Sequence, residues 1–288
     1  MAGTMNSTIC TPEEKTFEAN AVKLNYLEWG PGAAEPLVTL HGGAWCWQEY
    51  LSVLPSLAER WHTYSLDLRG NGRSGWVPDA YRLKDFVADN AQFLGQLRAP
   101  AVLVGHSIGG VIALMLAAQC PDRVKALIIE DVPLTLDGYQ KVVDSSRDMF
   151  GVWLSLKKAA RSEAELALAL ADAYKGYPGV TSGWVLFFAR CLWLLDPTFF
   201  NNLLYDFDGF TAGFDGKEIV SRIDRPVLFL RGEAKLGAVM PEDDLSWLQQ
   251  RSRNVKCVLV DGVGHLLHLE ERGQQPVLTA MMAFLDGK

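Results

Sequence analysis

A serine with glycines on both sides stands where a strand pattern changes into a helical pattern. Residues 105–110 read GHSIGG, with an apolar run at 101–104 before them and a helical pattern over 108–120 after them. The Gly-x-Ser-x-Gly pattern alone arises often by chance, but in this setting it predicts a sharp turn that lifts the Ser107 hydroxyl above a sheet. Side chains in place of the glycines would collide with the turn or the helix. We therefore predict a nucleophile at Ser107, and the alternative is a plain helix N-cap.

Short apolar runs alternate with helical patterns on both sides of this turn. We expect strands at 22–26, 37–40, 63–68, 101–104, 126–129, 227–230 and 257–260. We expect helices at 87–97, 108–120 and 275–285. The first strand alternates apolar and polar residues and is interpreted as an edge strand. Such alternation is typical of an α/β fold, with a mostly parallel sheet and helices on both faces.

The regular alternation fails in one long segment of the chain. Between residues 133 and 223 four or so helical patterns follow one another, including 162–174 and 183–195. We interpret residues 133–223 as a helical cap inserted into the core. The core domain is then formed by residues 1–132 and 224–288.

Charge and cysteine content exclude several classes of partner. The net charge of -7 and pI near 5.3 leave no basic face for nucleic acid or anionic membrane surfaces. The five cysteines are scattered and odd in number, which argues against a disulfide framework or a zinc site. Neither a leader pattern nor a run of about 18 apolar residues is present, so cytoplasmic residence is expected. A small molecule is the expected partner, and a homo-oligomer is left open.

A general base for the serine must come from one of five histidines. His265 follows the last expected strand in the sequence GVGH, on a loop that can place an imidazole over the carboxyl edge of the sheet. His106 should point away from Ser107 and act in packing or hydrogen bonding. His268 is expected to be a partly buried histidine at the start of a helix. We therefore predict His265 as the base.

A glycine pair follows the strand 37–40, in the sequence HGGAW at 41–45. Glycines allow the backbone to approach a substrate closely, so the N–H groups of Gly43 and Ile108 are predicted to form an oxyanion hole. The ring of His41 is expected to brace neighbouring turns.

Together these motifs resemble the α/β-hydrolase fold family over nearly the whole chain. The resemblance rests on HGG at 41–43, DLRGNGRS at 67–74, the turn at 105–110 and Gly264-His265, all in the family's chain order. It implies an eight-stranded sheet, a serine hydrolase that works through an acyl-enzyme, and no metal or organic cofactor. The family also includes lactonases, amidases, carbon–carbon bond hydrolases, lyases and catalytically silent receptors.

The acid of the triad departs from the usual family pattern. The family's usual position, after the strand 227–230, is occupied here by Lys235. Some members carry the acid one strand earlier, and this resemblance implies Asp131, 24 residues after Ser107. Its neighbour Glu130 points to the opposite face of the strand, so the two cannot both reach His265. Glu233 and Glu130 remain alternative acids.

Aromatic residues in the expected cap and beside the glycine pair predict an apolar pocket. The candidate substrate-binding residues are Trp45, Trp153, Trp184, Phe187 and Trp193. We therefore predict hydrolysis of a small hydrophobic or aromatic ester or lactone. Alternatives are an amidase or carbon–carbon bond hydrolase on the same triad, a non-catalytic small-ligand receptor, and a hydroxynitrile-type lyase suggested by GAWCW at 43–47. Arg190 and Lys235 are interpreted as surface charges rather than carboxylate-binding residues.

Overall fold

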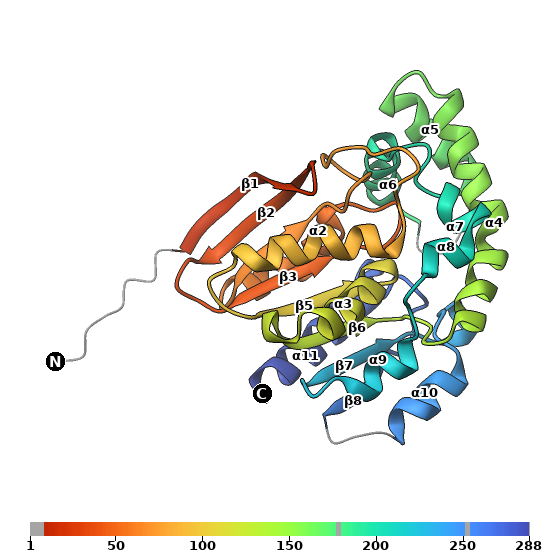
Figure 1. Cartoon of the computed structure of the whole chain (residues 1–288). Coiled ribbons are helices and arrows are strands. Elements are labelled where there is room, and N and C mark those ends of the chain that lie inside the picture. The colour runs from red at the N-terminus through yellow and green to blue at the C-terminus, as the bar shows by residue number, and fades with distance from the viewer. Residues whose placement is uncertain (1–8, 177–179, 251–253, 288) are drawn as a thin grey trace.

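An eight-stranded sheet forms the centre of the computed structural model, which describes residues 9–176, 180–250 and 254–287 (Figure 1). The strands are β1 (Ile9–Ala19), β2 (Val22–Pro31), β3 (Pro36–Leu40), β4 (His62–Leu66), β5 (Ala101–His106), β6 (Val124–Glu130), β7 (Val227–Arg231) and β8 (Val255–Leu259). Their order is β1-β2-β4-β3-β5-β6-β7-β8. The pairs β1/β2 and β2/β4 are antiparallel, and all others are parallel. The predicted mostly parallel sheet is confirmed.

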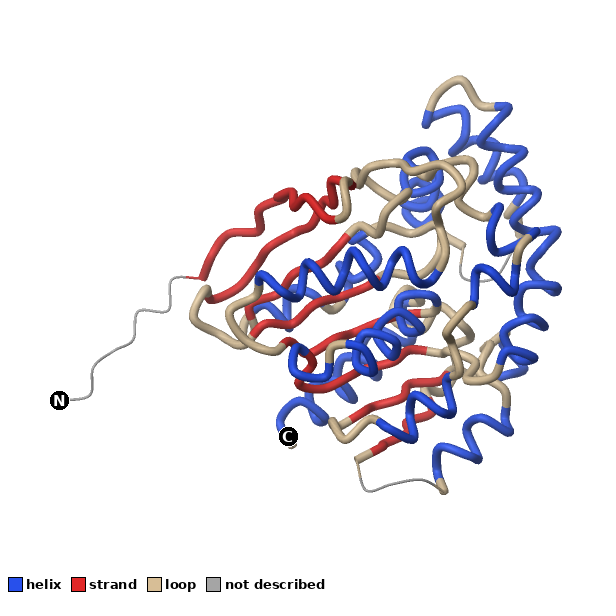
Figure 2. Tube along the Cα trace, in the orientation of Figure 1, coloured by secondary structure: helices blue, strands red, loops and turns tan. Residues whose placement is uncertain are grey.

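Helices cover both faces of the sheet because its strands alternate their side chains between two apolar layers. One layer packs under α1 (Leu54–Ala58) and α11 (Glu271–Asp286), and it contains Leu37, Val102, Val104, Ile128 and Leu228. The other packs under α2 (Leu83–Gln96), α3 (Ile108–Gln119) and α9 (Gly216–Arg222), and it contains Val38, Leu103, Leu127, Ile129 and Phe229. Figure 2 shows the helices on either side of the strands.

The segment between β6 and β7 is helical, and apart from α9, which packs on the sheet domain, it lies beyond one end of the sheet (Figures 1 and 2). We call it the β6–β7 insertion, residues 133–176 and 180–223. Its helices are α4 (Leu136–Ala159), α5 (Glu163–Ala173), α6 (Ser182–Leu194), α7 (Asn201–Tyr205), α8 (Phe207–Thr211) and α9. The side chains of Thr135, Ser162 and Thr181 cap the three longest of them. The last of these helices, α9, packs on α3 of the core. The predicted division into a core and a cap stays a prediction.

Several sequence-based boundaries differ from the structure. β1 lies outside β2, so the expectation that residues 22–26 form an edge strand is wrong. The sequence of β1 carries Glu13, Glu14, Lys15 and Glu18. Such charged residues are tolerated on an edge strand, but they leave too few apolar residues for the sequence to predict a strand. The helix α10 (Glu242–Gln249) was not expected, and α11 begins before the predicted residue 275.

Short 3₁₀ turns complete the path of the chain: η1 (Trp47–Ser52), η2 (Pro121–Arg123) and η3 (Ala234–Leu236). Within the described ranges, no helix combines the length and apolarity needed to cross a membrane.

The motif at residues 67–74 is fixed to α2 by a buried ion pair. Arg69 donates from Nε to Asp89 Oδ2 and from Nη2 to Asp89 Oδ1, each over 2.6 Å. Arg69 is 6% exposed and Asp89 is 1% exposed. A buried guanidinium is tolerated only with such a partner.

Replacing Asp89 with alanine should therefore destabilise the fold strongly. Because Asp89→Ala leaves the Arg69 charge buried and unpaired, we expect the free energy of unfolding to fall by about 3–5 kcal/mol, measured by urea denaturation. Asp137→Ala removes an exposed partner of Lys141 and serves as the control, with no measurable loss. Equal losses in the two variants would contradict this account.

Candidate active site

The turn between β5 and α3 holds Ser107 in a strained backbone conformation. Its φ is 53° and its ψ is -123°. Cβ atoms would lie 2.4 Å from Gly109 O at position 105 and 2.1 Å from Leu40 O at position 109, so only glycine permits this close approach. The Ser107 side chain caps no N–H of α3, and the geometry therefore gives no support to a simple N-cap.

His265 lies against the end of β6, where it meets Asp131. Its Nδ1 is 2.8 Å from Asp131 Oδ2. The carboxylate of Asp131 is fully buried and also accepts hydrogen bonds from the N–H groups of Val239 at 2.7 Å and Met240 at 3.1 Å. These bonds fix its orientation, so Asp131 can select the His265 tautomer that leaves Nε2 free to accept a proton.

The two alternative acids have other partners. Glu130 leaves the strand on the opposite side, and its Oε2 is 2.7 Å from Nδ1 of His268. Glu233 accepts from the N–H of Gly262 at 2.6 Å and pairs with Lys235, also at 2.6 Å. The structure therefore brings Asp131, and neither Glu130 nor Glu233, to His265.

His268 differs from its expectation. It lies in the turn before α11, not in the helix, and it is fully buried rather than partly buried. Its ring stacks on Tyr50, with centroids 4.5 Å apart and an interplanar angle of 12°. The reason for its burial is its partner, the fully buried carboxylate of Glu130, which requires a hydrogen-bond donor.

The glycine turn after β3 presents a free backbone donor. No residue in the described ranges accepts a hydrogen bond from the Gly43 N–H, and the following Ala44 has a φ of 65°. Phe199 and Phe200 from the β6–β7 insertion lie over it, each with Cε1 3.8 Å from where a Cβ at position 43 would be. At the neighbouring turn between β5 and α3, Ile108 is the first residue of α3, where helical N–H groups have no intrahelical acceptor.

His41 braces these turns, as expected from the sequence. Its Nε2 accepts from the N–H of Leu68 at 2.9 Å, and its Nδ1 is 2.6 Å from the carbonyl oxygen of Gly42. This arrangement suits a neutral imidazole. Burial lowers the pKa of His41 and outweighs the opposing effect of Glu49 and Asp67.

Ser107 Oγ makes no hydrogen bond with any residue that the structure describes. The ring of His265 lies beside residue 106, with ring centroids of His106 and His265 4.6 Å apart. The serine and the imidazole are thus brought to the same end of β5. Hydrogen bonds of this kind are often long before substrate binds.

A buried ion pair that the sequence did not reveal joins the turns around Ser107. Glu49 accepts from the Gly42 N–H at 2.9 Å through Oε2, and its Oε1 is 2.8 Å from His106 Nδ1. The other ring nitrogen of His106, Nε2, is 2.9 Å from the carbonyl oxygen of His265. Both ring nitrogens face acceptors, so the ring is protonated at both. In the sequence, the only hint of this pair is the acidic Glu49 within the aromatic segment 45–50, and this hint does not identify His106 as its partner.

The charge state of this ring follows from its surroundings. Burial lowers the pKa of His106, but the charge and hydrogen bond of Glu49, together with the charge of Glu130 and the carbonyl of His265, outweigh burial and raise the pKa to about 9. Burial likewise opposes ionisation of Glu49, yet the charge of His106 keeps the pKa of Glu49 below its usual value. The imidazolium of His106 thereby links the glycine turn to the loop of His265.

The predicted aromatic residues divide between two places. Trp45 stacks on Phe187 at 5.5 Å, contacts Trp184 at 6.1 Å and reaches Trp153 through Phe188. Trp193 instead lines a separate cavity, described below.

Two further contacts concern α6. Cys46, beside the glycine turn, has its Sγ 2.7 Å from Sγ of Cys191, and both residues are buried. Arg190 pairs with Glu163 at 2.6 Å, and the two side chains are 41% and 38% exposed, in agreement with the interpretation of Arg190 as a surface charge.

The His106–Glu49 pair predicts a pH dependence of stability. A folded pKa of about 9, above the usual value of 6.5, means that the stabilisation is complete below about pH 6.5 and is lost as pH rises through about 9. We expect the wild type to lose about 3 kcal/mol of unfolding free energy relative to His106→Gln across this window. Urea denaturation of both proteins from about pH 6 to about pH 10 measures it. A difference that does not change with pH would disprove the linkage.

Known proteins resemble this chain in sequence and in fold. The family model described as the alpha/beta hydrolase family matches residues 37–279. Lipase LipV of Mycobacterium tuberculosis is 33% identical over 129 residues, covering 43% of this chain and 48% of the lipase. The 2-hydroxymuconate semialdehyde hydrolase of a Pseudomonas species is 38% identical over 105 residues, covering 34% of this chain and 36% of that enzyme. The alignments thus span about half or less of these curated relatives.

Solved structures match over almost the whole chain. A putative lipase from Acinetobacter baumannii has a TM-score of 0.75 at 21% identity, covering 96% of this chain and 91% of that one. The E-2-(acetamidomethylene)succinate hydrolase has a TM-score of 0.73 at 20% identity, covering 96% and 100%. At these identities the likeness concerns the fold. With a family model that matches most of its length, the chain belongs to the alpha/beta hydrolase family.

Proposed function

We propose that the protein is a serine hydrolase that cleaves a small hydrophobic or aromatic ester or lactone through an acyl-enzyme at Ser107. The observation that carries the proposal is the 2.8 Å contact between His265 Nδ1 and Asp131 Oδ2, at the same sheet edge as the strained Ser107. A nucleophile, a base and an orienting acid are the parts that acyl transfer needs. The lipase and esterase names among the partial-length relatives agree with this reaction class.

In the proposed first step, His265 Nε2 accepts the proton of Ser107 Oγ as the oxygen attacks the substrate carbonyl. Asp131 stabilises the imidazolium that forms. The N–H groups of Gly43 and Ile108 donate to the developing oxyanion. His265 then protonates the leaving oxygen, the C–O bond breaks, and a water activated by His265 releases the acid from Ser107.

The preference for an apolar substrate rests on the aromatic cluster beside the glycine turn. Trp45 is almost fully buried, while Trp184 and Phe187 are half-buried and reach it from α6. Rings at this position favour an acyl or alcohol group without charge. We further propose a small molecule as the partner, and cytoplasmic residence because Cys46, Cys120, Cys191 and Cys257 are free thiols.

A carbon–carbon bond hydrolase is the second candidate. It uses the same three groups, and 2-hydroxymuconate semialdehyde hydrolase is among the partial-length relatives, at 38% identity over 105 residues. Turnover of a panel containing esters, lactones and vinylogous 1,5-diketones separates the two candidates. A catalytically silent receptor would instead be acylated once at Ser107, without multiple turnover.

The triad is tested on a short p-nitrophenyl ester. Asp131→Asn should reduce kcat by about 10⁴-fold, because the histidine loses the partner that fixes its tautomer, and Ser107→Ala should abolish the acyl-enzyme. Glu233→Gln, the matched control in the loop after β7, should keep nearly full kcat. Stopped-flow and steady-state kinetics with mass spectrometry of the acyl-enzyme measure these effects. If Glu233→Gln loses most of its kcat while Asp131→Asn keeps it, Asp131 is not the acid of the triad.

A further inference from the structure

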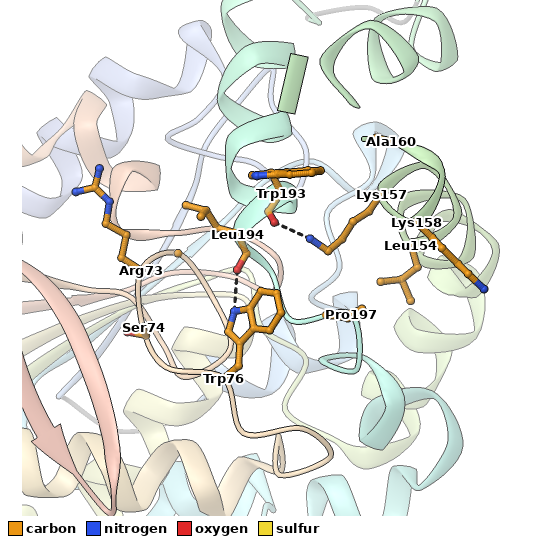
Figure 3. Close-up of a pocket in the computed structure, with 11 residues that line it drawn as sticks. Arg73, Ser74, Trp76, Leu154, Lys157, Lys158, Ala160, Trp193, Leu194 and Pro197 are labelled. Carbon is orange, nitrogen blue, oxygen red and sulfur yellow. Dashed lines mark hydrogen bonds between the residues drawn. The ribbon is translucent and has the colours of Figure 1, made fainter. Parts of the chain in front are cut away.

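A cavity of about 750 Å³ lies between the loop that follows β4 and the β6–β7 insertion (Figure 3). Its lining includes Trp76, Leu154, Lys157, Trp193, Leu194 and Pro197. The size falls within the range of small-molecule sites, about 300–1,000 Å³. Ser107, His265 and Asp131 do not line it, so this cavity is distinct from the triad.

Lys157 directs its ammonium group into this cavity, between two indole rings. Its Nζ donates to the carbonyl oxygen of Trp193 at 2.6 Å and lies 5.4 Å from the Trp193 ring and 5.8 Å from the Trp76 ring. The Lys157 side chain is half-buried, and burial lowers its pKa. Contacts with aromatic faces stabilise a cation but leave its charge unneutralised.

Within the described part of the chain, no carboxylate forms an ion pair with Lys157. The acid with the strongest influence on it is Asp196, whose charge opposes the effect of burial. Both carboxylate oxygens of Asp196 are already used: one accepts from Tyr81 Oη and the other from Thr198. A half-buried ammonium without a counter-charge favours an incoming anion.

Two other cationic residues line the cavity but do not point into it. Arg73 extends away from the indole rings and pairs with Glu14 at 2.6 Å (Figure 3). Lys158 is exposed and turns away from Lys157. The cavity therefore offers one cation, which matches a single negative charge.

We propose that this cavity binds an apolar organic monoanion, with its carboxylate on Lys157 and its aromatic or alkyl body against Trp76 and Leu154. Trp76 is 50% exposed, an unusual exposure for so large an apolar ring, and it is held in place by a 3.1 Å hydrogen bond from Nε1 to the carbonyl oxygen of Leu194. The rest of an acidic chain, with a net charge of -7, repels anions, so binding at one place depends on this ammonium. No group of the triad takes part, and the site is independent of the proposed hydrolase activity.

The test compares an acid with its neutral counterpart by isothermal titration calorimetry on the full chain. The probes are 4-phenylbutyrate and 4-phenylbutan-1-ol, which share the same apolar body. We expect the acid to bind more tightly, and Lys157→Met to weaken its binding by at least about 10-fold, the equivalent of 1.4 kcal/mol. Lys158→Met, one residue away and turned outward, should change the Kd by less than about 2-fold. Trp76→Ala should weaken both probes.

A measurement on the unaltered protein guards against misfolding of Lys157→Met. Raising the ionic strength should weaken binding of the acid and leave binding of the alcohol unchanged, because only the acid uses the ammonium. Equal affinity for acid and alcohol, equal losses in Lys157→Met and Lys158→Met, or absence of acid binding at millimolar concentration would each overturn the proposal. Because the readout is heat of binding, failure here leaves the triad experiments unaffected.

Discussion

The close approach of the first turn of α3 to the ends of β3 and β5 is the constraint on which the site depends. Positions 105 and 109 carry no side chain, and the backbones of helix and sheet touch there. This contact forces the positive φ of Ser107 and points the start of α3 toward the same edge as the glycine turn. A larger residue at either position would move the helix away and separate the hydroxyl from the backbone donors.

Asp131 and His106 complete this arrangement from opposite sides. Asp131 directly follows β6, has a positive φ of its own and is held by the N–H groups of Val239 and Met240. His106 ends β5 and bonds the backbone carbonyl of His265, while its partner Glu49 bonds the glycine turn. The ring and the backbone of His265 are thus each held by a buried partner, Asp131 and His106.

The sequence was informative wherever local chemistry determines structure. Strand-to-helix alternation and the glycines around Ser107 predicted the sheet, the sharp turn at Ser107 and the placement of His265 at the same edge of the sheet. It was uninformative where the deciding contact is distant: Glu49 meets His106 across 57 positions and Glu130 meets His268 across 138. β1 was missed for a different reason, since an edge strand needs only one apolar side and so shows a weak pattern. The choice of Asp131 depended on family resemblance, because propensity does not distinguish it from Glu130.

The chain enters the β6–β7 insertion two residues after Asp131, and the first residues on this path are held in the core. Val132 and Leu134 are fully buried, and the Leu134 N–H donates to the buried carboxylate of Asp244 at 2.8 Å. The first residue after β6 that is not buried is Thr135, which caps α4. An evolving lineage can consequently lengthen, shorten or exchange the helices beyond this point, while the contact between Asp131 and His265 keeps its geometry.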